Sequence, residues 1–582
     1  MTNFLGRAER QKNKWIITAQ PHVMMKLKNI FGGIAKNSVG KVELSDTPAN
    51  CAELLWFCQR YPLEVVQRSY MAMQAALQHE REATMAKVLA PDYVPPANTA
   101  MALQPRHYQK VATDYAYHSG GLLLVDEMGL GKTCVGITLM TKPGTLPAVV
   151  VAETQICRQW CREIVKFAPG LLPHLVREGK PYDVTLSHYD RSKRQWIHTR
   201  EPDVLVMNYH KLANWAEWLV EQKRAITLVF DEVQALRHHE TARHAAARVV
   251  RNSSRWCLAT SGTPIYNYGG EIWSVIDVVR PGALGARDEF GREWCTSVGM
   301  DGSKLLVDDP DALGTYLRSS GVMLRRTAKD VGKELPAMQT VIHEVDADAD
   351  VLADISANAI ALAKTILATT GAGISKMQAS GEFDAKLRQA TGIAKAPHVA
   401  QFVRMIVEQG HKVLLMGWHR AVYELWLRLL SDEKQGDLKP VFITGSESER
   451  QKDVSFKAFT EGDSQVLILS HRSAAGLDGM QKVCGRIVWG ELPWCPGEME
   501  QANYRLQRDG QGEIVTSYVL VADDGSDPVM LDILGVKDGQ SNGIRDPGSA
   551  VAKPLANQVD PAHVRKLAEA YLRKHAERQQ TT

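Results

Sequence analysis

The sequence predicts an α/β protein with parallel sheets, and three observations support this prediction. Short apolar runs recur between stretches of helical pattern, for example at 122–125, 147–152, 204–207 and 227–230. Runs of this length that are rich in Val, Leu and Ile are typical of strands buried on both faces of a parallel sheet. Polar residues that could bind a ligand or take part in catalysis follow several of these runs. Ligands bind such sheets at the carboxyl ends of the strands.

Length and composition limit the class of protein. A chain of 582 residues predicts about three to four domains. Charged residues make up 23%, which is typical of an ordinary globular protein, and the net charge of +3 is too small to indicate a partner. No apolar run approaches the roughly 18 residues needed to cross a bilayer, so we expect no membrane partner. The polar, charged stretch from Arg7 to Lys14 lacks the apolar core of a signal peptide.

The nine cysteines are scattered without a CxxC pair. This spacing supports neither a zinc site nor a disulfide framework, and it predicts a reducing compartment.

Residues 1–95 are expected to form a small α+β accessory domain. Residues 1–41 hold eight Lys or Arg side chains and one acid, a local net charge of +7. Such a segment suits an anionic polymer such as DNA, and a solvated basic surface is the alternative. The expected elements are strands at 15–18 and 42–44 and helices at 50–61 and 63–87, before a proline-rich linker at 91–98.

The stretch from Gly121 to Thr133, GLLLVDEMGLGKT, has the features of a phosphate-binding loop. Glycines let backbone N–H groups close around phosphate oxygens, and the N-terminus of the next helix favours an anion. Lys132 is placed to reach the β- and γ-phosphates and Thr133 to hold Mg²⁺. Asp126 stands where the first glycine of the usual pattern belongs, and a glycine-rich turn ending in Lys-Thr is the alternative. The predicted contacts to the nucleotide are Asp126, Glu127, Met128, Gly129, Leu130, Gly131, Lys132 and Thr133.

Three further groups of residues complete the expected first half of the site. Gln109, about twenty residues before the loop, has an amide that can donate to and accept from the edge of adenine. Asp231 and Glu232 end an apolar run 99 residues after Lys132. Asp231 is expected to hold Mg²⁺ through water, and Glu232 to orient or deprotonate the attacking water. The polar turn Ser261, Gly262 and Thr263 follows another strand and is expected to sense phosphate or contact a second ligand.

Several motifs follow one another in a specific order. They are DEMGLGKT at 126–133, DEVQ at 231–234, SGTPIYN at 261–267, MLRRT at 323–327 and QANYRLQRDGQ at 501–511. Together they resemble the Snf/Swi family of superfamily-two ATPases, which are double-stranded-DNA translocases, over roughly residues 100–525. The pattern is most similar to the annealing-helicase-like branch and to small bacterial or phage relatives.

The resemblance implies two RecA-like lobes with ATP between them. It places the first lobe at 96–345, the second at 346–545 and a basic C-terminal tail or helix at 546–582. In the second lobe it implies that Arg505 and Arg508 reach the γ-phosphate, with Gln501 on the same helix face. Arginines facing solvent are the alternative. Ser470 and Gly476 belong to the segment that contacts DNA and nucleotide in the family.

Two positions depart from the family pattern. Gln234 replaces the histidine that usually closes the acidic motif, which leaves metal chemistry intact and affects coupling to the second lobe. Asp478 stands where the family usually has Asn, and its carboxylate is expected to weaken a backbone contact to phosphate.

The expected function is an ATP- and Mg²⁺-dependent translocase on double-stranded or forked DNA, in replication, repair or recombination, with replication or repair proteins as partners. The expected compartment is the cytoplasm of a bacterium or phage-infected cell, or the nucleus of a eukaryote. The alternatives are a strand-separating DNA or RNA helicase, a polymerase-displacing motor, and a nucleotide-gated binding protein without turnover.

Overall fold

The computed structural model shows two compact units. The first holds the residues up to Val331 together with Arg545 and Asp546, and the second begins at Gly332. Each unit is described by itself. The described residues are 4–35, 37–190, 195–265, 269–298, 304–332, 336–348, 351, 374–445, 447–471, 479–493, 496–508, 510–528, 530–531, 534 and 545–546.

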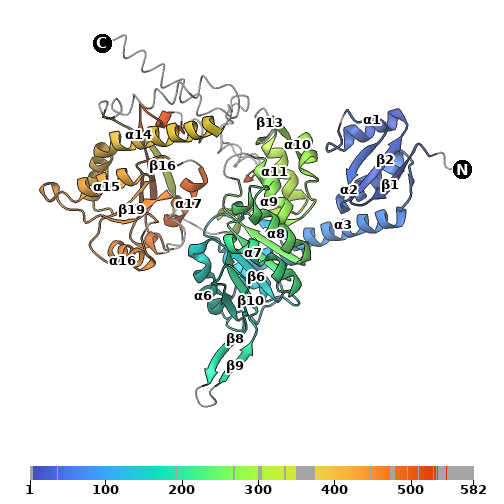
Figure 1. Cartoon of the computed structure of the whole chain (residues 1–582), viewed down its shortest axis with the longest axis horizontal. Helices are drawn as coiled ribbons and strands as arrows, with labels where there is room; N and C mark the ends of the chain where they lie inside the picture. The colour runs from blue at the N-terminus through green and yellow to red at the C-terminus, as the bar shows by residue number, and fades with distance from the viewer. Residues whose placement is uncertain are drawn as a thin grey trace, which may run out of the picture. The chain divides into compact units, whose positions relative to one another are not determined.

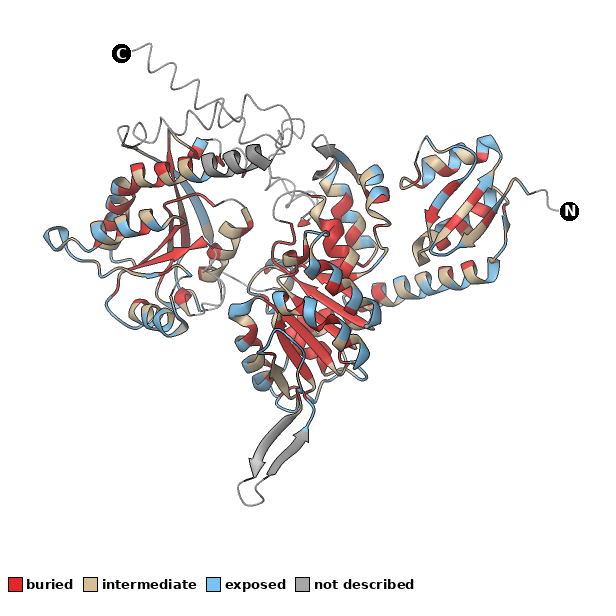
Figure 2. Ribbon diagram, in the orientation of Figure 1, coloured by how far each residue is buried: buried red, intermediate tan, exposed pale blue. Residues whose placement is uncertain are grey.

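The first unit is built on a parallel sheet of seven strands among its described residues, in the order β15-β5-β12-β11-β6-β10-β7. The central strands are buried apart from the last residues of β10 and β11, as Figure 2 shows. The strands are β5 (Gly121–Leu124), β6 (Ala148–Ala152), β7 (Pro173–Leu175), β10 (Val204–Asn208), β11 (Thr227–Asp231), β12 (Trp256–Thr260) and β15 (Met323–Leu324). They confirm the strands expected from the apolar runs.

Helices cover both faces of this sheet. Because side chains alternate along a strand, β6 sends Val149 and Val151 into one core cluster and Val150 into the other. The helices are α4 (His107–Ser119), α5 (Lys132–Met140), α6 (Cys157–Phe167), α7 (Tyr209–Glu221), α8 (Ala242–Ser253), α9 (Glu271–Val279), α10 (Arg287–Trp294) and α11 (Pro310–Ser319). A hairpin of β8 (Leu186–Asp190) and β9 (Gln195–Arg200) extends from the connection between β7 and β10 (Figure 1). A second hairpin joins β13 (Cys295–Val298) to β14 (Lys304–Val307).

The N-terminal part of this unit has a mixed sheet in the order β3-β2-β1-β4. Thr47 caps the second helix by accepting a hydrogen bond from the Asn50 backbone N–H. The strand β1 was not expected, because its sequence GRAERQ is polar and buries only Ala8. The elements are β1 (Gly6–Gln11), β2 (Lys14–Ala19), α1 (Pro21–Ile30), β3 (Val42–Ser45), α2 (Pro48–Arg60), β4 (Glu64–Val65) and α3 (Arg68–Val88).

The helix α3 joins this part to the seven-stranded sheet (Figure 1). Near its start, Met71 is buried in the core of the N-terminal sheet. Near its end, Met85 and Val88 are buried in a cluster with residues of α4 and β5. A second connection is polar, because the Ser45 hydroxyl donates to Glu289 (2.5 Å) and the Arg292 guanidinium donates to the Gly33 carbonyl. The N-terminal part is therefore attached to the rest of the first unit at two places.

The second unit has a parallel sheet of six strands among its described residues, in the order β16-β21-β20-β17-β19-β18. β16 lies beside β21 and so belongs to this sheet. The strands are β16 (Met338–Val345), β17 (Val413–Gly417), β18 (Val441–Ile443), β19 (Val466–Ser470), β20 (Arg486–Trp489) and β21 (Val515–Ala522). The helices are α14 (Ile374–Glu408), α15 (Arg420–Leu430), α16 (Glu449–Thr460) and α17 (Pro496–Leu506). Parallel sheets flanked by helices in both units confirm the predicted fold class.

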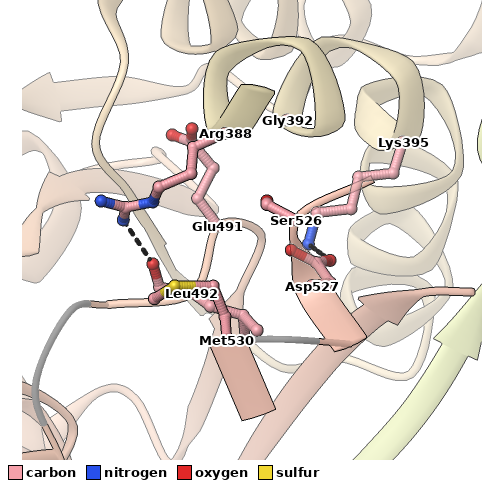
Figure 3. Close-up of a pocket in the computed structure, with 8 residues that line it drawn as sticks. All are labelled: Arg388, Gly392, Lys395, Glu491, Leu492, Ser526, Asp527 and Met530. Atoms are coloured by element: carbon pink, nitrogen blue, oxygen red, sulfur yellow. Dashed lines mark hydrogen bonds and ion pairs between the residues drawn. The ribbon is translucent and has the colours of Figure 1, made fainter. Parts of the chain in front are cut away.

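A buried ion pair connects α14 to the turn after β21. Figure 3 shows Lys395 pointing at Asp527 in a small pocket that Glu491 also lines. The Lys395 ammonium lies 2.6 Å from the Asp527 carboxylate and donates to the Leu520 carbonyl at 2.8 Å. The two side chains are 1% and 4% exposed. Among the described residues, no helix is long and apolar enough to cross a membrane.

We predict that Lys395→Met destabilises the second unit by about 3–5 kcal/mol, because it leaves the Asp527 carboxylate buried without its cation. The measurement is urea unfolding followed by tryptophan fluorescence. The control is Lys439→Met, which removes an exposed pair with Asp463 and should cost at most about 1 kcal/mol. Equal costs for the two variants would show that the buried pair does not hold the unit together.

Candidate nucleotide-binding site

The loop between β5 and α5 has the backbone of a phosphate cradle. Gly129 and Gly131 adopt left-handed conformations, with φ of 85° and 75°, and Gly131 caps α5. A Cβ on Gly131 would lie 2.5 Å from the Gln109 amide nitrogen, so only glycine fits there. The N-terminus of α5 therefore faces the loop, and Lys132 and half-buried Thr133 stand in its first turn.

The amine of Lys132 donates to backbone carbonyls of its own loop, to Asp126 at 2.7 Å and to Glu127 at 3.4 Å. Burial lowers the pKa of this amine, and the nearby carboxylates of Glu232, Asp126 and Asp231 act in the opposite direction. The structure thus brings Lys132 together with the acidic pair, as the sequence predicts. Phosphate oxygens are suitable replacements for the two carbonyls as partners of the amine.

Asp231, at the carboxyl end of β11, is held in place by several donors. The Trp160 indole N–H donates to one carboxylate oxygen at 2.8 Å, and the Thr260 hydroxyl donates to the other at 2.8 Å. The Tyr209 hydroxyl donates to the Asp231 carbonyl. Burial raises the pKa of Tyr209 well above its ordinary value, which keeps this hydroxyl protonated. A carboxylate fixed in this way suits a metal held through water.

Sequence reasoning missed these three supporting residues. Thr260 could have been found, because β11 and β12 are parallel neighbours and their register pairs it with Asp231. Trp160 projects from α6, and nothing in the local sequence connects it to Asp231.

Glu232 follows in a conformation that is rare for a residue with a side chain, with φ of 53°. Such backbone strain occurs at functional sites, where surrounding contacts hold it. The Gln234 amide donates to the Glu232 carboxylate at 2.6 Å, and Gln234 is buried. The glutamine that departs from the family pattern therefore orients the predicted water-activating carboxylate.

Gln109 lies in the first turn of α4 and is buried. Its amide oxygen accepts from the Arg106 backbone N–H at 2.8 Å, and its amide nitrogen donates to the Leu130 carbonyl at 3.0 Å. The structure thus places Gln109 against the phosphate loop. Recognition of adenine by this amide stays a prediction.

The turn after β12 contacts the phosphate loop. The Ser261 hydroxyl accepts from the Thr263 backbone N–H at 2.9 Å, which closes the turn. The Met128 side chain lies against Gly262, where a Cβ would be 2.4 Å from the Met128 methyl group. A shift of the phosphate loop would therefore move the Met128 side chain against this turn.

We predict that Gly262→Ala displaces Met128 and weakens nucleotide binding roughly tenfold, the order of effect expected when neighbouring groups couple. Equilibrium binding of a fluorescent ADP analogue gives the affinity, and a thermal melt monitors folding. Gly170→Ala is the matched control, because a Cβ there meets nothing within 4 Å. Identical affinities for the two variants would mean that Met128 adapts and that this turn does not communicate with the loop.

The MLRRT segment lies beside the phosphate loop. β15 is a parallel neighbour of β5, and Arg326 forms an ion pair with Asp126. Arg325 donates to the Val125 carbonyl and, through Nε and Nη2, to the two carboxylate oxygens of Asp546, at 3.0 Å each. Burial alone would raise the pKa of Asp546, but Arg325 and Arg545 hold it below its ordinary value.

The remaining predicted residues lie in the second unit. Gln501 and Arg505 are half-buried on α17, and Arg508 follows this helix and donates to the Tyr504 carbonyl at 3.2 Å. Ser470 is buried at the end of β19. Gly476 and Asp478 lie outside the described residues, as do residues 547–582 of the predicted basic tail. The roles of Arg505 and Arg508 as fingers stay predictions from the resemblance.

Comparison with known proteins gives consistent relatives. The chain is 25% identical over 71% of its length to the SWI/SNF-related matrix-associated actin-dependent regulator of chromatin subfamily A-like protein 1 of Xenopus tropicalis, covering 42% of that protein. It is 24% identical over 74% of its length to the human DNA annealing helicase and endonuclease ZRANB3, covering 39% of it. The chain thus spans about two fifths of these curated relatives.

Among solved structures, the SWI2/SNF2 ATPase core of Sulfolobus solfataricus in complex with dsDNA is similar at 20% identity and a TM-score of 0.36, covering 83% of this chain and 99% of that one. The model of the SNF2-related domain matches residues 23–353, more than half of the chain. The chain therefore belongs to the SNF2-related domain family.

Proposed function

We propose that this protein is an ATP- and Mg²⁺-dependent motor that moves along double-stranded DNA. The observation that carries the proposal is that Lys132 follows β5, and that Asp231 ends β11 with Glu232 next to it, at the carboxyl edge of one parallel sheet in a chain of the SNF2-related family. Lysine, a helix N-terminus and fixed carboxylates are the groups that nucleotide hydrolysis requires.

The residues present fit both ATP and Mg²⁺. Gly129 and Gly131 give the loop its left-handed turns, and the Lys132 amine donates to two loop carbonyls that phosphate oxygens could replace. Thr133 would hold the metal directly and Asp231 through water, and the metal would supply positive charge to the phosphates. Glu232, kept in place by Gln234, orients the attacking water and accepts its proton.

The name of one relative supports a DNA substrate, because it is a DNA annealing helicase and endonuclease. A motor that tracks along DNA must contact phosphates rather than bases, so its affinity should fall steeply with salt. We propose that the motor acts in DNA replication, repair or recombination and that its partners are proteins of those processes.

The test is steady-state ATP hydrolysis without nucleic acid and with blunt duplex, forked duplex, single-stranded DNA or RNA. The expected result is strong stimulation by duplex or forked DNA and loss of activity in Lys132→Ala. Stimulation only by RNA or single strands would overturn the substrate, and hydrolysis that Lys132→Ala retains would overturn the assigned site.

We also propose that the N-terminal part contacts DNA. Among the described residues, Arg7, Arg10 and Lys14 are paired with acids and Lys28 donates to the Ser38 carbonyl. The exposed Lys12, Lys26 and Lys41 are the residues that would meet phosphates. Removing the whole segment is a poor test, because Met85 and Val88 pack in the core beside α4.

The sharper variant is Lys12→Glu, Lys26→Glu and Lys41→Glu combined. We expect weaker DNA binding and unchanged hydrolysis in the absence of DNA. Unchanged affinity for both blunt and forked duplexes would contradict this contact.

A further inference from the structure

Asp126 differs from the glycine of the usual phosphate loop, and the structure shows where its side chain goes. Asp126 is 1% exposed. Its two carboxylate oxygens accept from Arg326, one from Nε at 3.1 Å and the other from Nη2 at 2.5 Å. The forked contact fixes both side chains in one geometry. The carboxylate therefore points to the MLRRT segment and leaves the phosphate cradle free.

The backbone of the same residue contacts the predicted phosphate-binding lysine. The Asp126 carbonyl accepts from the Lys132 amine at 2.7 Å. The next residue is held from the same side, because the Glu127 backbone N–H donates to the Arg326 carbonyl at 2.8 Å. The Glu127 carboxylate accepts from the Ala328 backbone N–H at 2.6 Å. Arg326 and its neighbours thus fix the part of the loop that holds Lys132.

Arg326 also reaches the other wall of the site. Its Nη1 donates to the Tyr108 carbonyl at 2.6 Å, and its guanidinium lies 5.4 Å from the centre of the Tyr108 ring. The Tyr108 hydroxyl in turn donates to the Leu130 carbonyl at 3.1 Å. One guanidinium therefore links the start of the phosphate loop to the first turn of α4, which carries Gln109.

We propose that Arg326 is a positioning residue for the nucleotide: through Asp126 and Tyr108 it sets the distance between the phosphate loop and α4. This inference rests on the proposed ATP site. A buried ion pair can also serve stability alone. The partners of Arg326 favour the positioning role over stability alone. All three, Asp126, Glu127 and Tyr108, belong to the phosphate loop or to the first turn of α4 just before Gln109.

The experiment compares Arg326→Lys and Asp126→Asn, singly and combined, with the control Asp277→Asn. The lysine keeps the charge and loses the fork. Asp277 accepts from Arg248 between α9 and α8, so the control removes the carboxylate partner of an arginine elsewhere in the first unit. The measurements are hydrogen exchange of amides 126–131 without nucleotide, the Kd for a fluorescent ADP analogue with Mg²⁺, and the Tm.

We expect faster exchange of these amides and a roughly tenfold higher Kd in each single variant, with the double variant no worse than the singles because the residues act as a unit. Asp277→Asn should lower the Tm only. Wild-type exchange and Kd in Arg326→Lys, whatever its Tm, would overturn the positioning role. Failure of the wild-type protein to bind the analogue would overturn the proposed function, while the exchange measurement would still test how Arg326 holds the loop.

Discussion

Glu232→Gln is expected to reduce kcat for ATP hydrolysis by about 10² to 10⁴, the range attributed to general acid–base catalysis. The amide cannot accept a proton from the attacking water, although it keeps the size of the side chain. Nucleotide affinity should change little, because Lys132, Thr133 and the loop amides are the groups predicted to bind the phosphates. Steady-state turnover and binding of a fluorescent ADP analogue separate the two effects.

Glu240→Gln is the control, since its side chain is 85% exposed and lies in the same connection between β11 and α8. It should hydrolyse ATP at the wild-type rate. If Glu232→Gln also retained its turnover, Glu232 would not activate water, and the protein would need another base.

Arg505→Ala and Arg508→Ala are expected to reduce kcat by about 10³ to 10⁵, the range measured for arginine fingers. A permanently charged, planar guanidinium stabilises the charge that develops on the transferred phosphoryl group. The effect should fall on kcat more than on nucleotide affinity, because the predicted role of these arginines is to stabilise the transition state. Single-turnover hydrolysis gives the chemical rate directly.

The control for these variants is Arg420→Ala on α15, which removes an exposed pair with Glu424. If both finger variants kept a kcat within twofold of wild type, Arg505 and Arg508 would not act on the γ-phosphate. The alternative raised by the sequence, arginines that face solvent, would then hold.

The sequence was most informative where one segment carries the whole signal. The strand before the phosphate loop is apolar because both faces are covered, and the glycines mark the left-handed turns that the structure contains at Gly129 and Gly131. Asp231 and Glu232 were recognisable because they end such a strand. The polar strand β1 was not recognisable from the sequence, because only one of its side chains is deeply buried.

The contacts that hold the site in place were not predictable from local sequence. Arg326 and Asp126 are 200 residues apart, and they meet only because β15 lies parallel to β5. The donors to Asp231 likewise come from α6 and β12. Motifs identify candidate residues for the chemistry, whereas the sheet order determines which residues support them.

The measurement that tests the central claim most directly is displacement of a third strand from a blunt DNA triplex by the protein and ATP. Movement along duplex DNA predicts ATP-dependent release that ADP does not support and that Lys132→Ala abolishes. DNA-stimulated hydrolysis without release, together with unwinding of a forked duplex, would contradict the account and indicate a strand-separating helicase.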